Sequence, residues 1–340
     1  MTKRLKGFFG TPGTADSAAP FLKWAGGKGQ LLGQLEPLLP DRFARYVEPF
    51  VGGGAMFFYL YNLGRIAAGA LLNDANEAPP ERSNTSGRVP APGATALLVC
   101  PPEGIGAFGR AHALLNDANA ELMTCYRVVR DAGQLPGLIE RLREHAARVA
   151  DADYYYRVRA WDREPGFAER YSPAERAART IFLNHACYNG LYRLNRRGQF
   201  NVPHGKWSRP PGVFDEANLW ACHRALQGVE LLNEGFEACL ERAAKGDFVY
   251  LDPPYDPLSA TSSFTAYTGA EFRARDQERL AEAFRALDAR GCRVLLSNSA
   301  TPFIRRLYRG YAMTALLAAR AISSKASGRG KIAELAIRNY

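Results

Sequence analysis

The sequence predicts an α/β fold whose central sheet is interrupted by a long, mainly helical insertion. Two apolar runs, at 46–51 and 247–251, are typical of buried strands, and each is followed by residues that stop strand pairing. Between them, residues 134–185 follow a helical pattern. At 340 residues the chain is long enough for one large domain or for two that share a core.

The first part of the predicted core begins after a short lead. Residues 1–19 are small and basic and lack the apolar stretch of a secretory signal, so we expect them to be disordered. A loop at 20–28 and an amphipathic helix at 31–38 precede the strand at 46–51. Three glycines at 52–54 and a further helix follow. This order of strand, glycine turn and helix lets a ligand approach the backbone at a helix N-terminus.

One seven-residue segment occurs twice, at 70–76 and at 113–119. An acidic residue about 20 positions past such a glycine turn commonly bonds ribose hydroxyls, and each copy carries a candidate, Asp74 or Asp117. The spacing favours Asp74, whereas the helical pattern that directly follows the second copy favours Asp117 slightly. The choice stays open, because 113–119 could instead extend that helix. The Pro-, Gly- and Ser-rich segment at about 77–112 is expected to be loop.

The rest of the sequence divides into an insertion and a second core part. A core at 20–150 and 240–340 is therefore expected, with the insertion at 151–239 and a good helix start at Ser172. The second core part is expected to hold, in order, a helix at 236–244, the strand at 247–251, a helix around 279–287, a strand at 293–298, a loop at 323–330 and a last apolar strand.

The strand at 247–251 ends in Asp252-Pro253-Pro254-Tyr255. Neither proline has an N–H, so pairing stops there and leaves a carboxylate, stiffly held carbonyls and an aromatic ring. Ligands of open α/β sheets bind at this edge. These groups suit a planar ligand with an exocyclic amine. A carboxylate and a carbonyl can accept hydrogen bonds from the two N–H groups of such an amine. The alternative for the four residues alone is a capped Pro-Pro turn.

A basic segment at 190–214 contains no Asp or Glu. It carries Arg193, Arg196, Arg197, Lys206 and Arg209, interleaved with Tyr192, Phe200 and Trp207. Basic side chains suit phosphates and aromatic rings suit bases, so this segment predicts a nucleic-acid contact, in line with the net charge of +10. A solvated basic loop is the alternative.

Cysteine and apolar patterns exclude other classes of protein. The six cysteines form no C-x-x-C pair and the five histidines do not gather near them, which predicts neither a disulfide framework nor a metal site. No run of 18 apolar residues occurs, so no membrane span is expected. These features favour a reduced, cytoplasmic protein.

Four segments in this order resemble one family, the Dam-type (class D12, alpha-group) DNA adenine-N6 methyltransferases. The resemblance covers about 20–340 apart from 77–112, and it includes the stretch at 257–267 and the tail at 322–324. The four segments are 20–28, 48–54, 195–203 and 252–255.

The resemblance implies a Rossmann-like sheet that binds S-adenosylmethionine as methyl donor, with an inserted, mainly helical DNA-recognition domain. It implies catalytic roles for Asp252, Pro253, Pro254 and Tyr255, of which Asp252 would lie between the donor methyl and the target amine. The cofactor contacts that it implies are Trp24, Lys28, Glu48, Phe50, Gly52, Gly54, Asp252 and either Asp74 or Asp117.

The resemblance also implies that double-stranded DNA is the partner and that the target adenine is flipped onto Tyr255. Leu194 stands where close relatives carry an aromatic wedge, and an aliphatic side chain can still part a base step. Arg196 and Arg197 would read guanine or contact phosphate, and Asn195 and Asn201 would read adenine or phosphate. The DNA contacts implied are Tyr192, Arg193, Leu194, Asn195, Arg196, Arg197, Asn201, Pro203, Lys206, Trp207 and Arg209.

The sequence leaves two other functions open. The chain could methylate an amine of RNA or of a protein glutamine, or it could bind DNA without activity because the duplication impairs it. The expected recognition sequence is GATC, the expected form is a monomer, and a cognate restriction endonuclease is a possible partner.

Overall fold

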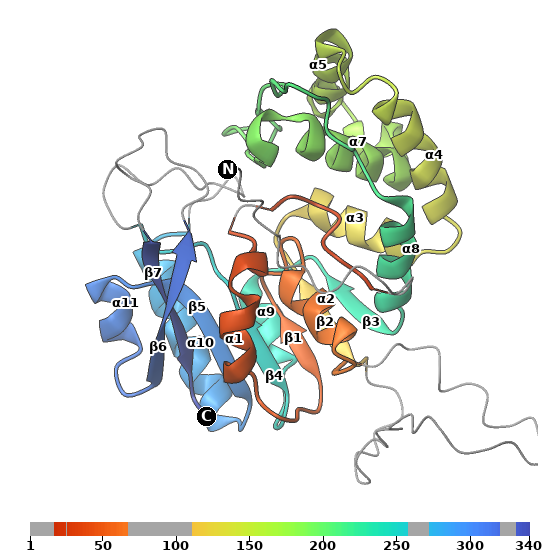
Figure 1. The fold of residues 1–340 in the computed structure, drawn as a ribbon. Helices are drawn as coiled ribbons and strands as arrows, with labels where there is room; N and C mark the ends of the chain where they lie inside the picture. Colours follow the sequence, from red (N-terminus) through yellow and green to blue (C-terminus); the bar gives the residue numbers. More distant parts are fainter. Residues whose placement is uncertain (1–16, 25, 67–110, 258–271, 320–330) are drawn as a thin grey trace, which may run out of the picture.

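The computed structural model describes residues 17–24, 26–66, 111–257, 272–319 and 331–340 (Figure 1). Its described part contains one seven-stranded sheet in the order β3-β2-β1-β4-β5-β7-β6. Neighbours pair in parallel, except that β7 runs antiparallel to both β5 and β6. The predicted α/β fold is confirmed. The strands are β1 (Tyr46–Glu48), β2 (Ala113–Asn116), β3 (Val229–Leu232), β4 (Phe248–Leu251), β5 (Arg293–Ser299), β6 (Ala312–Ala319) and β7 (Lys331–Arg338).

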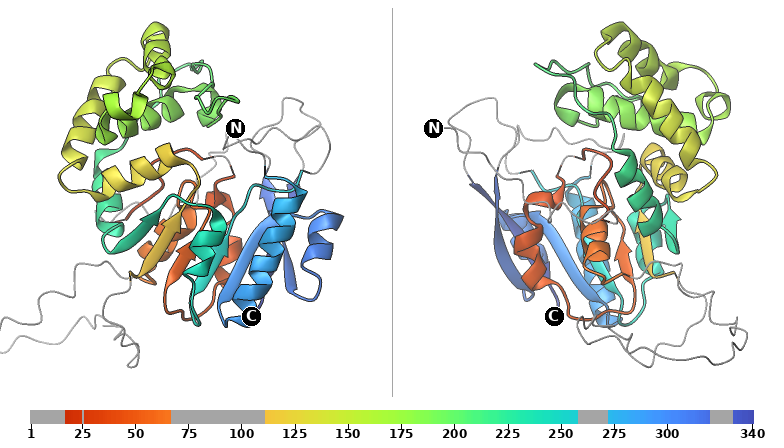
Figure 2. Two further views of the ribbon diagram at one scale, coloured as in Figure 1. Left: turned by 180° about the vertical axis from the view of Figure 1, so that it is seen from behind. Right: turned by 45° about the vertical axis from the view of Figure 1, so that its right-hand side comes forward.

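Helices cover both faces of the sheet, and a further group lies beyond its carboxyl edge. Helices α1 and α2 lie on one face, α9 and α10 lie on the other, and α4, α5 and α7 form the separate group (Figures 1 and 2). The helical elements are η1 (Lys28–Gln30), α1 (Leu32–Leu35), η2 (Glu36–Leu38), α2 (Ala55–Asn62), α3 (Ala120–Arg130), α4 (Leu135–Ala146), α5 (Ala152–Ala160), η4 (Trp161–Arg163), α6 (Phe167–Arg170), α7 (Pro173–Ala186), η5 (Tyr188–Gly190), α8 (Glu216–Ala225), α9 (Phe236–Glu241), α10 (Ala274–Ala289) and α11 (Pro302–Leu307).

The strands β1, β2, β4 and β5 are buried on both faces. Tyr46 and Tyr250 belong to the apolar cluster that includes α2, α3 and α7, whereas Val47 and Val249 belong to the cluster that includes α9 and α10. Successive strand residues point to opposite faces, so both faces must be apolar where helices cover them. The near-continuous apolar runs in the sequence have this origin.

The second copy of the repeated segment forms β2, beside β1 in the sheet. Ala113 lies in register with Tyr46, and Leu115 lies in register with Glu48. The alternative in which 113–119 extends the following helix is therefore wrong. Helix α3 begins after Asn119, whose side chain accepts a hydrogen bond from Leu122 N. Asp74, most of the 77–112 segment, residues 258–271 and the loop expected at 323–330 lie outside the described residues.

Several expected elements differ in extent. Strand β1 ends at Glu48 because Pro49 has no N–H to pair. The helix expected at 31–38 is divided into α1 and η2, since Pro37 starts a new turn in η2. The strands β3 and β6 and the helices α8 and α11 were not predicted, and β3 is a four-residue edge strand whose burial alternates.

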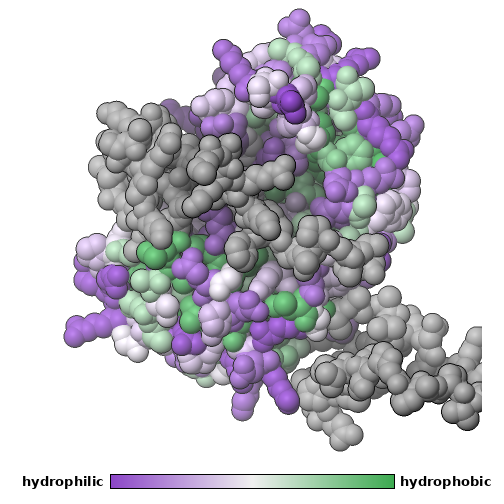
Figure 3. Space-filling model, in the orientation of Figure 1, coloured by the Kyte–Doolittle hydropathy of each residue, from purple (hydrophilic) through white to green (hydrophobic). Residues whose placement is uncertain are grey.

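The helical group is built from well-capped helices. Ser172 and Glu175 form a reciprocal capping box at the start of α7, as the sequence predicts. Over the face in Figure 3, hydrophilic side chains line the outer rim of this group, and apolar ones lie between them. No helix within the described ranges is both long and apolar enough to cross a membrane.

Candidate functional site

The segment Asp252-Tyr255 leaves the sheet at the carboxyl end of β4, between β1 and β5. Its carboxylate is paired with a lysine that approaches from η1, because Lys28 Nζ lies 2.7 Å from Asp252 Oδ1. The lysine is 5% exposed and the aspartate 19%, so solvent screens this pair only weakly. The same ammonium lies 4.7 Å from the centre of the Tyr255 ring.

The backbone after Asp252 is held from behind by β5 and α10. Gln277 Nε2 donates to Pro254 O at 2.8 Å, and Asn298 Nδ2 donates to Gln277 Oε1 at 3.0 Å. Asn298 Oδ1 also accepts from Asp256 N, and Ser299 Oγ donates to Asp256 O. Because Gln277 and Asn298 are almost fully buried, their amides fix the loop in a low-dielectric surrounding.

Carboxylates gather at this edge of the sheet. Burial raises the pKa of Asp252 and the nearby Lys28 ammonium lowers it. Burial also raises the pKa of Glu48, which is 2% exposed and whose Oε2 has no hydrogen-bond partner among the described residues. Such an arrangement suits a ligand that brings positive charge and hydrogen-bond donors.

The glycine turn after β1 is bonded to Asp117. Gly52 has φ of +48° and Gly54 has φ of +71°, conformations in which a side chain is strained. Gly52 N donates to Asp117 Oδ2 at 3.1 Å, and Tyr126 Oη donates to Gly52 O at 3.0 Å. Burial raises the pKa of Asp117 to about 6, against the two backbone N–H groups that lower it. Asp117, one of the two acidic candidates, therefore lies at the turn.

The loop that carries Trp24 is tied to the helical group. Asn184 of α7 accepts from Lys23 N and donates to Lys23 O, both at 2.7 Å. The Trp24 ring stacks on Tyr192, with centroids 4.8 Å apart, and a Cβ at Gly52 would lie 2.7 Å from it. Phe50, which precedes the turn, packs on Phe236 and Phe272 in the apolar cluster that includes α9 and α10. Aromatic side chains thus lie on both sides of the glycines.

Within the basic segment, residues 193–201 form a hairpin. Leu194 and Phe200 pair across it, and Gly198 has φ of +75° in the turn. The Asn195 side chain accepts from Arg197 N and Gln199 N, and its amide donates to Gln199 Oε1.

Several side chains of the hairpin are engaged within it and others are exposed. Arg193 Nε donates to Asn201 Oδ1 at 2.7 Å, so both asparagines are bonded inside the hairpin. Arg196 and Arg197 are exposed at its tip.

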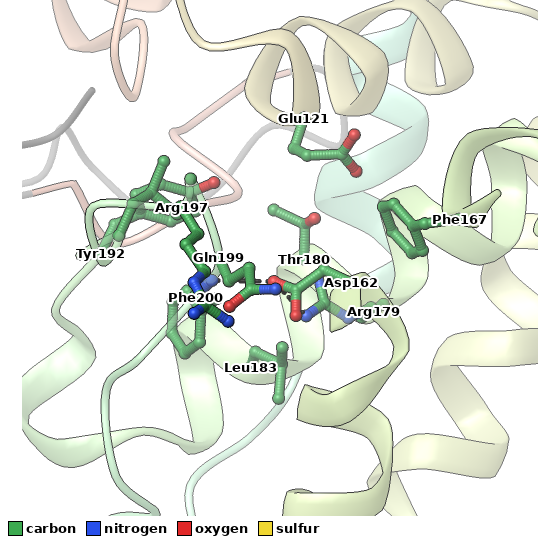
Figure 4. A pocket seen from close by; sticks show the side chains of 12 residues that line it. Glu121, Asp162, Phe167, Arg179, Thr180, Leu183, Tyr192, Arg197, Gln199 and Phe200 are labelled. Atoms are coloured by element: carbon green, nitrogen blue, oxygen red, sulfur yellow. Dashed lines mark hydrogen bonds and ion pairs between the residues drawn. The ribbon is translucent and has the colours of Figure 1, made fainter. Parts of the chain in front are cut away.

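A cavity of about 190 Å³ lies behind the hairpin (Figure 4). On its far wall, Asp162 Oδ2 accepts from Phe200 N at 2.8 Å and lies 2.8 Å from Nη2 of Arg179, which is 3% exposed. Arg163 Nη2 donates to Phe200 O at 2.7 Å. Both backbone groups of Phe200 are therefore held by η4, and Arg197 lines the cavity from the hairpin side.

The rest of the basic segment presents polar side chains. Lys206, Arg209 and Pro203 are exposed. Trp207 is half-buried, packs edge-on against His204 and lies over Gly205. Tyr192, which the sequence assigned to the DNA contact, is only 5% exposed and supports Trp24.

A family model for the D12 class of N6 adenine-specific DNA methyltransferases matches residues 24–78 and 107–322. The chain belongs to this family. The resemblance that the four segments predicted is confirmed, and so is the methyltransferase fold. The match leaves out 79–106, which lies within the segment between the two copies.

Named relatives of this D12-class chain agree over nearly its whole length. It is 36% identical to the type II methyltransferase M1.LlaDCHI of Lactococcus lactis subsp. cremoris, over 94% of this chain and 95% of the relative. It is 37% identical to the type II methyltransferase M.MjaIII of Methanocaldococcus jannaschii, over 94% and 99%. It is 32% identical to the DNA adenine methylase of Escherichia coli K12, over 93% of each.

The D12-class site thus brings together residues from distant parts of the sequence. Lys28, Glu48, Gly52, Asp117 and Asp252 meet at the carboxyl edge of the parallel strands, while the hairpin lies with the helical group. Sequence reasoning missed Asp162, which holds the hairpin, Gln277 and Asn298, which hold the loop, and Glu334, which accepts a hydrogen bond from Tyr255 Oη. The three polar residues at the end of an apolar strand, Ser297-Asn298-Ser299, were a usable signal for Asn298.

Proposed function

We propose that this D12-class enzyme transfers a methyl group from S-adenosylmethionine to N6 of an adenine in duplex DNA, at GATC. One observation carries the proposal. Gln277 donates to the Pro254 carbonyl, whereas the carbonyl of Pro253, the residue that follows Asp252 in the chain, accepts no hydrogen bond from the described residues. A carbonyl and a carboxylate on neighbouring residues can each accept a hydrogen bond from one N–H of an exocyclic amine.

The residues present fit the cofactor. Bound S-adenosylmethionine would supply an electrophilic methyl group on a positively charged sulfur. Glu48, with its unpartnered buried oxygen, and Asp252 offer negative charge to its amino and sulfonium groups. The glycines at 52 and 54, whose positive φ would strain a residue with a side chain, leave room for its amino-acid part, and Asp117 would take the ribose hydroxyls. Trp24, Lys28 and Phe50 complete the lining.

The target adenine has to leave the duplex to reach this edge, which costs a few kcal/mol of stacking and pairing. Tyr255 stacks on the flipped ring, while Asp252 and the Pro253 carbonyl each accept one N6–H. When both hydrogens are held, N6 is favoured to become more tetrahedral, and its lone pair then points toward the methyl donor. One N6 proton then leaves after transfer, with Asp252 as its first acceptor. Positioning supplies most of the rate.

The basic segment holds the DNA. Arg196 at the hairpin tip reads a base edge, while Arg193, Lys206 and Arg209 contact phosphates. Leu194 enters the base step and Trp207 lies beside the vacated position. Asn195 and Asn201 shape the hairpin, the buried Tyr192 supports it from within, and the exposed Pro203 contacts the DNA beside it.

The wider context of the enzyme is also part of the proposal. Two relatives are named type II methyltransferases, which favours a restriction–modification setting with a cognate endonuclease as partner. We propose a cytoplasmic monomer. Because Asp117 of the second copy lies at Gly52, the duplication leaves an acidic residue at the turn, and we favour an active enzyme over an inactive DNA-binding protein.

The test is methyl transfer from labelled S-adenosylmethionine to duplexes with and without GATC, followed by nucleoside analysis. The proposal predicts N6-methyladenine only in the GATC duplex. Label in RNA, or in neither duplex, would contradict it.

A further inference from the structure

Glu334 of β7 reaches the loop that carries the proposed catalytic residues. It lies in the antiparallel strand between β5 and β6, in register with Ser299 and with Leu316. Tyr255 Oη donates a hydrogen bond to Glu334 Oε2 at 2.7 Å, across 79 residues of sequence. Both side chains are half-buried. A short bond to a carboxylate is stronger than a neutral one, so this contact holds the tip of the tyrosine firmly.

The contact fixes the orientation of the ring and not the position of the loop. The loop backbone is already held by Gln277, Asn298 and Ser299. The remaining freedom of Tyr255 lies in its two side-chain torsions, the second of which is broad. Lys28 lies over one face of the ring, and the phenolic O–H, which stays in the ring plane, donates to Glu334, so the two contacts together favour one ring plane.

We propose that Glu334 is a positioning residue that sets the plane of the Tyr255 ring for stacking on the target adenine. The inference rests on the proposed function, since it requires that Tyr255 stack on a flipped base. A base stacks well only on a ring whose plane is set in advance, and small misplacements of reacting groups lower rates strongly.

The Glu334 charge acts on Asp252 as well. Lys28 of η1 and Glu334 of β7 act electrostatically on this carboxyl. Its charge acts in turn on Tyr46 and Glu48 of β1, on Tyr250 of β4 and on Tyr255. Glu334 raises the pKa of Asp252, and Lys28 lowers it. Removing the negative charge while keeping the hydrogen-bond acceptor therefore separates the two effects of Glu334.

Two substitutions carry the test. Glu334→Asp keeps the charge but is one methylene too short to reach Tyr255 Oη. Glu334→Gln keeps the reach and the acceptor but loses the charge. We expect Glu334→Asp to lower single-turnover methyl transfer by about 10- to 100-fold. We expect Glu334→Gln to keep most of the rate at neutral pH and to move the acid limb of the pH profile to lower pH.

A double-substitution cycle with Tyr255→Phe shows whether Glu334 acts through the tyrosine hydroxyl. Tyr255→Phe removes the hydroxyl and keeps the ring, so adding Glu334→Asp to it should cost little more. A second readout is a duplex with 2-aminopurine at the target position, whose fluorescence reports flipping and is quenched by stacking. Glu334→Asp should leave flipping intact and lower the quenching.

Wild-type activity separates the two claims. If wild-type enzyme neither methylates nor flips the target in any duplex, the proposed function fails. If wild-type enzyme is active and Glu334→Asp matches it, or if the losses from Glu334→Asp and Tyr255→Phe multiply, the role of Glu334 is overturned and the proposed function stands.

Discussion

The ammonium of Lys28 lies 2.7 Å from the carboxylate of Asp252, and both side chains are largely removed from solvent. The lysine comes from the first turn after the N-terminal loop and the aspartate from the end of β4, so folding of the whole core is needed to join them. The Lys28 ammonium lowers the pKa of this carboxyl against the burial that raises it, at the place where we propose that the target amine binds.

Lys28→Met should therefore make Asp252 harder to ionise. Since Lys28 is the cation that lowers the pKa of this carboxyl, its loss raises the pKa further. A protonated Asp252 accepts a hydrogen bond from N6–H less well than the carboxylate does. The acid limb of the plot of kcat against pH should therefore move to higher pH. The check is methyl transfer across pH with saturating cofactor, with Lys28→Arg as control because it keeps the charge. An unmoved limb in Lys28→Met would contradict the pairing.

Asp117→Asn should change both stability and cofactor binding. The unfolded chain loses this proton near the ordinary aspartate pKa of about 3.9, whereas burial raises the folded-state pKa to about 6. The folded state therefore holds more protons between these values, and the free energy of unfolding falls as pH rises through them, by about 1–3 kcal/mol after solvent screening. Asparagine removes this fall.

The measurement is denaturant unfolding from about pH 4 to about pH 7, together with titration of S-adenosylmethionine. Cofactor affinity should drop about tenfold or more in Asp117→Asn, because a charged hydrogen bond is lost. Asp74→Asn is the matched control from the other copy and should match wild type in both. Equal losses from the two variants would show that both copies matter.

Asp162→Ala should loosen the hairpin and destabilise the helical group. It leaves Phe200 N without its acceptor and the buried Arg179 without its carboxylate, which costs about 3–5 kcal/mol in comparable pairs. DNA affinity should fall while cofactor affinity stays unchanged. Glu164→Gln is the control, since Glu164 pairs with the exposed Arg170 and such surface pairs contribute about 0–1 kcal/mol. Unaltered DNA binding in Asp162→Ala would contradict the prediction that Asp162 holds the hairpin in place for DNA.

Arg196→Ala should reduce discrimination more than affinity. Its side chain is exposed at the hairpin tip, and a bidentate base contact contributes about 1–3 kcal/mol of discrimination. The measurement is binding to the cognate duplex and to duplexes with one changed base pair. Lys206→Ala should instead weaken all duplexes alike and lower the salt slope by about one. A uniform loss in Arg196→Ala would reassign this arginine to phosphate.

Local patterns predicted the parts of the site that depend on neighbours in sequence. The apolar strand that ends in Asp252-Pro253-Pro254-Tyr255 and the glycine turn could be placed because each motif carries its own flanks. The choice between Asp74 and Asp117 could not be made, because the two copies are identical and only pairing with β1 distinguishes them.

Glu334 was equally hidden from sequence reasoning. One acidic residue in a C-terminal strand has no local signal, and its partner Tyr255 lies 79 residues earlier.

The central claim is that Asp252 holds the target amine. The most direct measurement compares wild type and Asp252→Ala in methyl transfer from labelled S-adenosylmethionine to a GATC duplex, with cofactor binding measured alongside. The account predicts N6-methyladenine with wild type and none above background with Asp252→Ala, while the variant remains folded. Near-normal transfer by Asp252→Ala would contradict it.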